Sequence, residues 1–180
     1  FITCAWNIPD RKNSPILPSQ VTKREKMTVV KIFNNHPHYT LLKPAIEQVV
    51  SYIVNMEQQA VQSITFIASD DKTLNEMKVK LFGIDQLTDT ISINYNEIDQ
   101  PVEGEIYLSL DRIEDNAHTF KVSFEKELAL VIIHSVLHLL GYNDDNLNDK
   151  KQMQALQNFY IQQIKFPRLY RKRRIQPNYE

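Results

Sequence analysis

The chain has 180 residues, of which 42% are hydrophobic and 24% charged, a composition that indicates one globular domain. No apolar run approaches the roughly 20 residues that span a bilayer, and residues 1–26 lack the apolar core of a signal peptide. Cys4 is the single cysteine, so the chain cannot form an internal disulfide framework. We therefore expect a cytoplasmic protein without membrane contacts. The net charge of −1 is unevenly distributed, because residues 89–116 are strongly acidic and residues 165–174 are strongly basic.

The pattern of apolar residues predicts an α+β (mixed α/β) fold, a small four-stranded sheet covered by helices. Alternation predicts strands at residues 28–33, 61–68, 90–95 and 105–110. Helical spacing predicts helices at residues 40–58, 71–82, 124–140 and 148–165. Residues 1–26 have no periodicity and are expected to be an N-terminal extension that need not belong to the fold. Residues 27–165 would form a single domain and 166–180 a basic C-terminal tail.

The third predicted helix, with Ser123 as its N-cap, carries the candidate chemistry. His134 and His138 are four residues apart, so both imidazoles lie on one face and can bind one metal ion. Gly141 ends the helix and permits a reversal that brings Asp144 to a third ligand position. Three protein ligands with a fourth position open to water predict one catalytic Zn²⁺ per chain, at the C-terminal end of a central helix.

Other interpretations of these residues exist. Paired histidines can be core or surface residues bound to carboxylates, but this helix is apolar nearly all round, and burying two unpartnered imidazoles is costly. Asp145 could supply the carboxylate instead, one residue further along. His36, His38 and His118 have no spacing that links them, so we expect them at the surface.

Three segments of the chain carry a further pattern: Asp85-x-x-Thr88-Asp89-x-Ile91-Ser92, Gly104-Glu105-Ile106-Tyr107-Leu108-Ser109, and His134-x-x-Leu137-His138-Leu139-x-Gly141-Tyr142. In motif, order and spacing, these blocks resemble the YbeY family of bacterial rRNA maturation factors, which are zinc-dependent endoribonucleases with a metzincin-like site. The similarity extends over about residues 27–160.

The resemblance implies cleavage of single-stranded RNA in 16S rRNA 3′-end maturation and ribosome quality control, with the small ribosomal subunit as partner. It implies Zn²⁺ held by His134, His138 and Asp144. The zinc-bound water would be the nucleophile, and no side chain is expected to act as a further catalytic group. The candidate RNA contacts are mainly basic: Lys78, Lys80, Ser109, Arg168, Arg171, Lys172, Arg173 and Arg174. The basic segment could equally be a solvated tail, and Thr88, Asp89 and Ser92 could touch substrate or act as turn and strand-edge residues.

The chain departs from the family pattern at three places. Asp144 stands where the family usually has a third histidine, and its charge leaves the zinc centre at a formal +1, which predicts a more alkaline activity optimum. Ser135 replaces a glycine after the first histidine. Leu81 and Phe82 occupy the region where many members carry an arginine, for which a nearby lysine could substitute.

Two other functions are weighed against the endoribonuclease. A zincin protease needs a glutamate directly after the first histidine as general base, and Ser135 cannot accept that proton. A non-catalytic RNA-binding or ribosome-assembly protein could keep the metal for stability alone.

Overall fold

The computed structural model describes residues 29–97, 100–165 and 167–173. Its elements, in chain order, are β1 (Val29–Asn34), β2 (Tyr39–Leu41), α1 (Lys43–Met56), β3 (Val61–Ser69), α2 (Asp71–Phe82), β4 (Thr90–Asn94), β5 (Val102–Ser109), α3 (Leu110–Phe120), α4 (Phe124–Leu139), α5 (Leu147–Gln163) and β6 (Tyr170–Lys172). The expected extension at residues 1–26 and the candidate contact Arg174 lie outside the described residues. Within them, no helix has the length and apolarity to cross a membrane.

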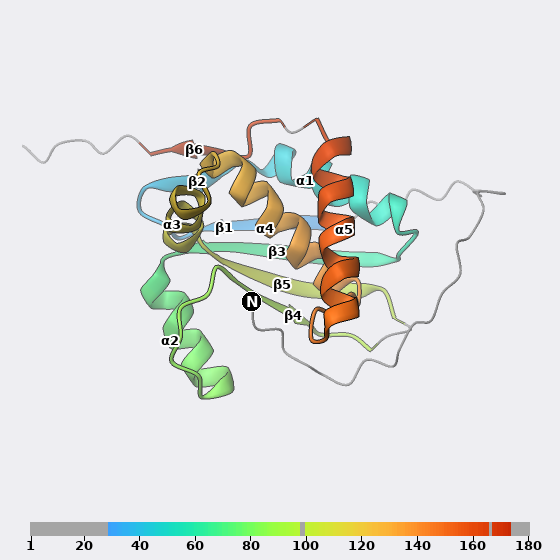
Figure 1. Ribbon diagram of the computed structural model, residues 1–180, viewed down its shortest axis with the longest axis horizontal. Helices are drawn as coiled ribbons and strands as arrows, with labels where there is room; N and C mark the ends of the chain where they lie inside the picture. Colours follow the sequence, from blue (N-terminus) through green and yellow to red (C-terminus); the bar gives the residue numbers. More distant parts are fainter. Residues whose placement is uncertain (1–28, 98–99, 166, 174–180) are drawn as a thin grey trace, which may run out of the picture.

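The main sheet has four strands in the order β1-β3-β5-β4 (Figure 1). β1, β3 and β5 are parallel, and β4 runs antiparallel to β5 at one edge. Ile64 and Phe66 of β3 and Ile106 of β5 are completely buried, because these central strands have neighbours on both sides and helices against one face. The predicted four-stranded α+β fold is confirmed.

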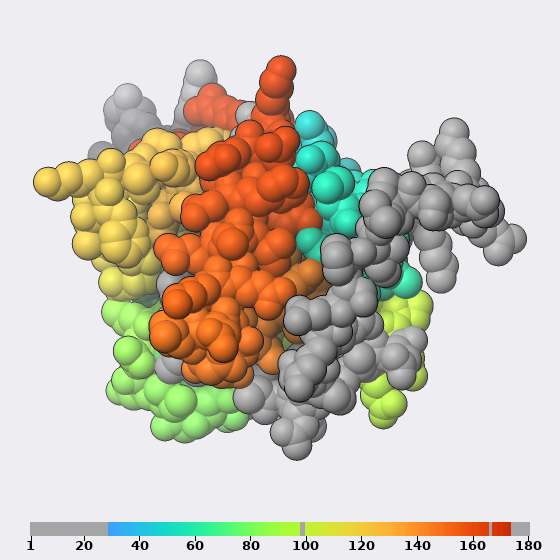
Figure 2. All heavy atoms as spheres, turned by 45° about the vertical axis from the view of Figure 1, so that its right-hand side comes forward, coloured from blue at the N-terminus to red at the C-terminus, as the bar shows by residue number. Residues whose placement is uncertain are grey.

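α4 is the central helix. Eleven of its sixteen residues are buried, as its nearly continuous apolar sequence requires. α1 and α5 both pack against it, and Figure 2 shows α5, in orange and red, lying across one face of the molecule beside α1, in cyan. This packing holds the last turn of α4 in the interior, where the candidate ligands lie.

Three elements, β2, α3 and β6, are missing from the sequence prediction. α3 begins directly after β5 because Ser109 ends the strand and also caps the helix, accepting a hydrogen bond from the Arg112 backbone N–H at 3.2 Å. β2 and β6 form a separate antiparallel pair, with Thr40 opposite Arg171. α1 therefore starts at Lys43 rather than at residue 40, and part of the expected basic tail is a strand of the folded unit.

The prediction that His36 lies at the surface is wrong, since its side chain is completely buried. Its Nδ1 accepts the backbone N–H groups of His38 and Tyr39 at 3.1 and 3.2 Å. The proton therefore sits on Nε2, which donates to Asp111 Oδ1 at 3.0 Å. These three hydrogen bonds, one of them to a residue 75 positions away, satisfy the buried ring, whereas His38 and His118 are exposed as predicted.

Candidate metal centre

His134, His138 and Asp144 form the candidate metal centre. Each offers one ligand atom, and these atoms all lie within 4.8 Å of one another. The two Nε2 atoms are 2.9 Å apart, and Asp144 Oδ1 lies 3.8 Å from His138 Nε2. The side chains of His138 and Asp144 are only 7% and 11% exposed, while Asp145, the alternative carboxylate, is exposed. Two imidazoles and one carboxylate at this spacing fit the donor set of a three-ligand zinc site.

The end of α4 positions the third ligand. The helix starts at the predicted cap, where Ser123 Oγ accepts the Lys126 N–H at 3.2 Å, and ends one residue before the predicted Leu140. Gly141 then has φ +96°, a left-handed conformation that favours glycine. The chain reverses there, with the Tyr142 N–H donating to Leu137 O at 3.0 Å, and Asp144 returns toward the histidines.

Hydrogen bonds on the far side of the ring orient His138. Its Nδ1 lies 2.7 Å from the backbone carbonyl of Tyr142, so Nδ1–H donates there and Nε2 directs a lone pair at the site. The Tyr142 hydroxyl donates to Glu57 at 2.6 Å, and the Tyr160 hydroxyl donates to the same carboxylate. Sequence reasoning missed Glu57, because it lies 85 positions before Tyr142 and is brought there only by helix packing.

Burial fixes the charge state of the two histidines in the metal-free protein. Burial, with a smaller contribution from the neighbouring His138, lowers the pKa of His134 to about 3. Burial also lowers the pKa of His138, against an opposing effect of Asp144. Both rings are therefore neutral at pH 7, which is the form that binds a metal ion.

We expect the metal-free protein to lose stability in mild acid. An unfolded histidine binds a proton near pH 6.5, whereas folded His134 does so only near pH 3, so the unfolded state takes up more protons between these values. The free energy of unfolding should fall as pH drops below 6.5, by up to about 1.4 kcal/mol per pH unit from this group. Urea unfolding in chelator at pH 7.5, 6.5 and 5.5 measures the slope.

Two variants make that measurement specific. His134→Gln should flatten the slope, because it removes the buried group that resists protonation. His118→Gln, at an exposed position on α3, should keep the wild-type slope. Equal slopes in the wild type and His134→Gln would contradict the buried, neutral state of His134.

Polar side chains of β4 bind α4 beside the ligands. Ser135, the residue in place of the family's glycine, is completely buried, with its hydroxyl donating to Val131 O and lying 2.8 Å from Thr90 Oγ1. Ser92 donates to the Ser135 carbonyl at 3.5 Å, and Asn94 donates to the Leu139 carbonyl at 3.4 Å. A serine thus fits after the first histidine as a link between α4 and the sheet edge.

The remaining sequence candidates divide into buried and exposed residues. Lys78 is 2% exposed and donates to the Gln86 carbonyl, and buried Ser109 donates to Asp71 at 2.5 Å. Thr88 and Asp89 are also buried. The exposed candidates are Lys80, Arg168, Arg171, Lys172 and Arg173. Neither group lies in the ligand cluster.

Comparison with known proteins points to one family. A family model described as "Endoribonuclease YbeY" matches residues 31–165. A protein of that name from Chlorobaculum tepidum is 38% identical over 136 residues, which is 76% of this chain and 98% of the relative. Another from Amoebophilus asiaticus is 38% identical over 109 residues, 61% of this chain and 74% of the relative.

A solved structure agrees with this assignment. The solution structure of TM1509 from Thermotoga maritima matches with a TM-score of 0.56 and 28% identity, covering 74% of this chain and 87% of that one. The family match spans α4, the ligand cluster, β3, β4 and β5, and all but the first two residues of β1. The chain therefore belongs to the YbeY family.

Proposed function

We propose that this protein is a zinc-dependent endoribonuclease of single-stranded RNA, acting in 16S rRNA 3′-end maturation and ribosome quality control. The observation that carries the proposal is the cluster of His134, His138 and Asp144, whose ligand atoms lie within 4.8 Å at the end of a buried helix in a YbeY-family chain. The small ribosomal subunit is the proposed partner, and the cytoplasm the proposed location.

The chain's own residues prepare the site for phosphodiester hydrolysis. When bound, Zn²⁺ supplies Lewis-acid polarisation of a phosphodiester oxygen and an acidified water nucleophile. His134 and His138 would hold the ion through neutral imidazoles, and the Tyr142 carbonyl fixes the tautomer of His138. Asp144 adds one negative charge, and the exposed cations Lys80 and Arg168 would contact the RNA backbone without reading its sequence.

The proposed function is tested by cleavage of a single-stranded RNA oligonucleotide and of its duplex. We expect internal cleavage of the single strand, loss of cleavage in chelator and recovery on addition of Zn²⁺. Cleavage that persists in chelator would contradict the proposal. Tight RNA binding by the zinc-loaded protein without cleavage would instead favour the non-catalytic RNA-binding alternative.

Replacing Asp144 with histidine should shift the pH–rate profile toward lower pH. A neutral third ligand leaves more positive charge at the centre, so the nucleophilic water ionises at a lower pH. The measurement is the cleavage rate between pH 6 and 10 for the wild type and Asp144→His, both with verified zinc content. Identical profiles would contradict the assigned effect of the carboxylate.

A further inference from the structure

A basic pocket lies on the β2–β6 pair, away from the ligand cluster. It is open, about 630 Å³ in volume, and lined by Asn34, Thr40, Arg171, Lys172 and Arg173. Three of these residues are cations and none is acidic. Among the described residues, none of the three cations forms an ion pair with a carboxylate. Such a pocket concentrates anions.

The structure holds Arg173 ready for an anion. Its Nε donates to Thr40 Oγ1 at 3.1 Å and its Nη2 to the Asn34 carbonyl at 2.7 Å. Its backbone N–H donates to the His38 carbonyl at 2.7 Å, which extends the β2–β6 pairing. A guanidinium has five N–H donors, so others remain for the open side of the pocket. Because these hydrogen bonds already orient the guanidinium of Arg173, little side-chain entropy is lost when a phosphate binds.

The neighbouring cations are placed by the strand register. Arg171 lies opposite Thr40 and Lys172 opposite Tyr39. Lys172 Nζ lies 5.4 Å from the centre of the Tyr39 ring, a cation–π contact that limits its freedom. The three positive groups are therefore carried by paired strands rather than by a tail with no fixed geometry.

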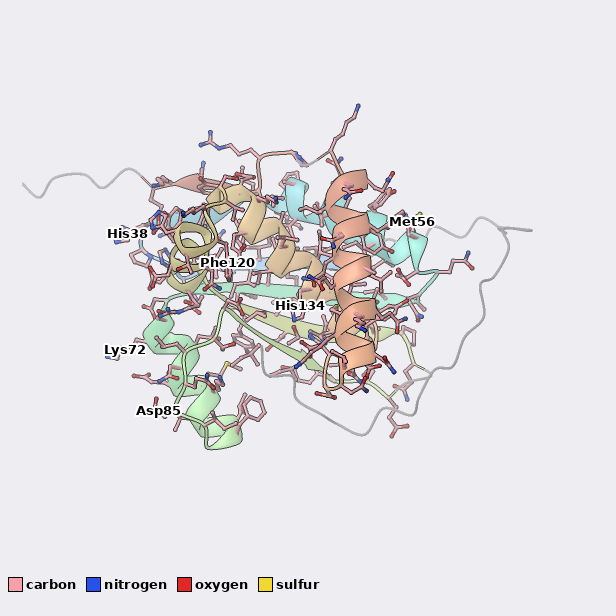
Figure 3. All side chains as sticks on the ribbon, viewed as in Figure 1. His38, Met56, Lys72, Asp85, Phe120 and His134 are labelled. Atoms are coloured by element: carbon pink, nitrogen blue, oxygen red, sulfur yellow. The ribbon has the colours of Figure 1, made fainter. Side chains whose placement is uncertain are left out.

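The pocket and the metal centre lie at opposite ends of α4. Phe124, the first residue of α4, packs against Tyr39 at 4.7 Å and Tyr170 at 4.6 Å between ring centres, which places β2 and β6 beside this end. His138 lies fourteen residues further on, about 21 Å along the helix axis. Figure 3 likewise shows His38, next to β2, well away from His134. The pocket is too far away to touch the phosphate at the metal centre.

We propose that this pocket is an RNA exosite that binds backbone phosphates of the strand being cleaved at the metal centre. The inference rests on the proposed endoribonuclease function. RNA is the favoured anion because it carries a phosphate at every nucleotide, so a strand bound at the metal centre has further phosphates to offer to the pocket. An OB-fold domain binds about 4–16 nucleotides of a single strand, and we expect an RNA in this range to reach from the pocket to the metal centre. The exosite makes affinity depend on RNA length.

The test uses the double variant Arg171→Gln/Lys172→Gln in the zinc-loaded full chain. Binding of a labelled trinucleotide and of an RNA of about 16 nucleotides is measured by fluorescence anisotropy at low temperature. The matched control is Lys31→Gln/Lys72→Gln, which removes the same charge from exposed positions on β1 and α2. An acidic peptide, deca-glutamate, serves as the probe for a protein partner.

The wild type should bind the longer RNA more tightly than the trinucleotide. The pocket variant should lower the ratio of these two affinities about tenfold. A plot of log affinity against log salt concentration should become less steep by about 0.7 for each phosphate that the variant no longer neutralises. The exosite would be overturned if the pocket and control variants weakened RNA binding equally, or if neither changed it. In that case, RNA cleavage by the wild type would still support the proposed function. Tight, pocket-dependent binding of the acidic peptide but not of RNA would overturn the exosite in favour of a protein partner. A wild type that neither binds nor cleaves RNA would overturn the proposed function as well.

Discussion

Replacing His138 with alanine is expected to remove stoichiometric zinc and to lower RNA cleavage by more than about 100-fold, since even changes around a ligand cost about 10–100-fold. His138 is the centre of the cluster: its Nε2 lies near both other ligand atoms, 2.9 Å from His134 Nε2 and 3.8 Å from Asp144 Oδ1. Without it, only two ligands remain, which is too few to hold Zn²⁺ tightly.

The matched control for this variant is His118→Ala, the same substitution at an exposed position on α3. It should retain both zinc and cleavage. Circular dichroism distinguishes loss of the ligand from loss of the fold. If His138→Ala cleaved RNA as fast as the wild type, the metal centre would not be the active site, and a contaminating ribonuclease would account for the activity.

Gly104→Ala is expected to destabilise the fold by about 1–3 kcal/mol or more, the cost of overpacking a tight core. A Cβ at this position would lie 2.6 Å from the Ile93 carbonyl oxygen and 2.9 Å from Leu139 Cδ2. The first of these atoms belongs to the backbone of the neighbouring strand, which cannot move without disturbing the sheet. Leu139 follows His138 directly, so the strain also reaches the metal centre, and we expect weaker zinc binding.

Urea unfolding measures this effect, with Glu103→Ala as control. Glu103 precedes Gly104 on β5, is only partly buried and accepts two long hydrogen bonds, from Gln62 Nε2 at 3.3 Å and Ser63 Oγ at 3.4 Å, so its substitution should lower the free energy of unfolding by about 1 kcal/mol or less. An unchanged urea midpoint for Gly104→Ala would contradict the close packing of α4 against β4 and β5.

The features that the sequence predicted depend on local geometry. The four-residue spacing of His134 and His138 places both rings on one helix face in any α-helix, and Gly141 supplies the reversal that Asp144 needs. The strands of the main sheet likewise show their own alternation. Such patterns are contained in a few neighbouring residues, so no tertiary information is required to find them.

The features that the sequence missed depend on contacts between distant residues. β2 and β6 have three residues each and exist as strands only because residues 39–41 meet residues 170–172. Lys78 is buried because its ammonium reaches the Gln86 carbonyl, an interaction that its charge gave no reason to expect. α3 follows β5 without a loop, so the alternating pattern of the strand continues into Leu110, the first residue of the helix.

The central claim is that His134, His138 and Asp144 together bind one zinc ion. Its most direct test is the zinc content of protein purified without chelator, measured by mass spectrometry for the wild type, Asp144→Ala and Asp145→Ala. Trace ribonuclease can imitate cleavage but cannot imitate stoichiometric metal. We predict about one zinc per chain in the wild type and Asp145→Ala, and a clear loss in Asp144→Ala. A wild type without zinc, or full zinc content in Asp144→Ala, would contradict the three-ligand site.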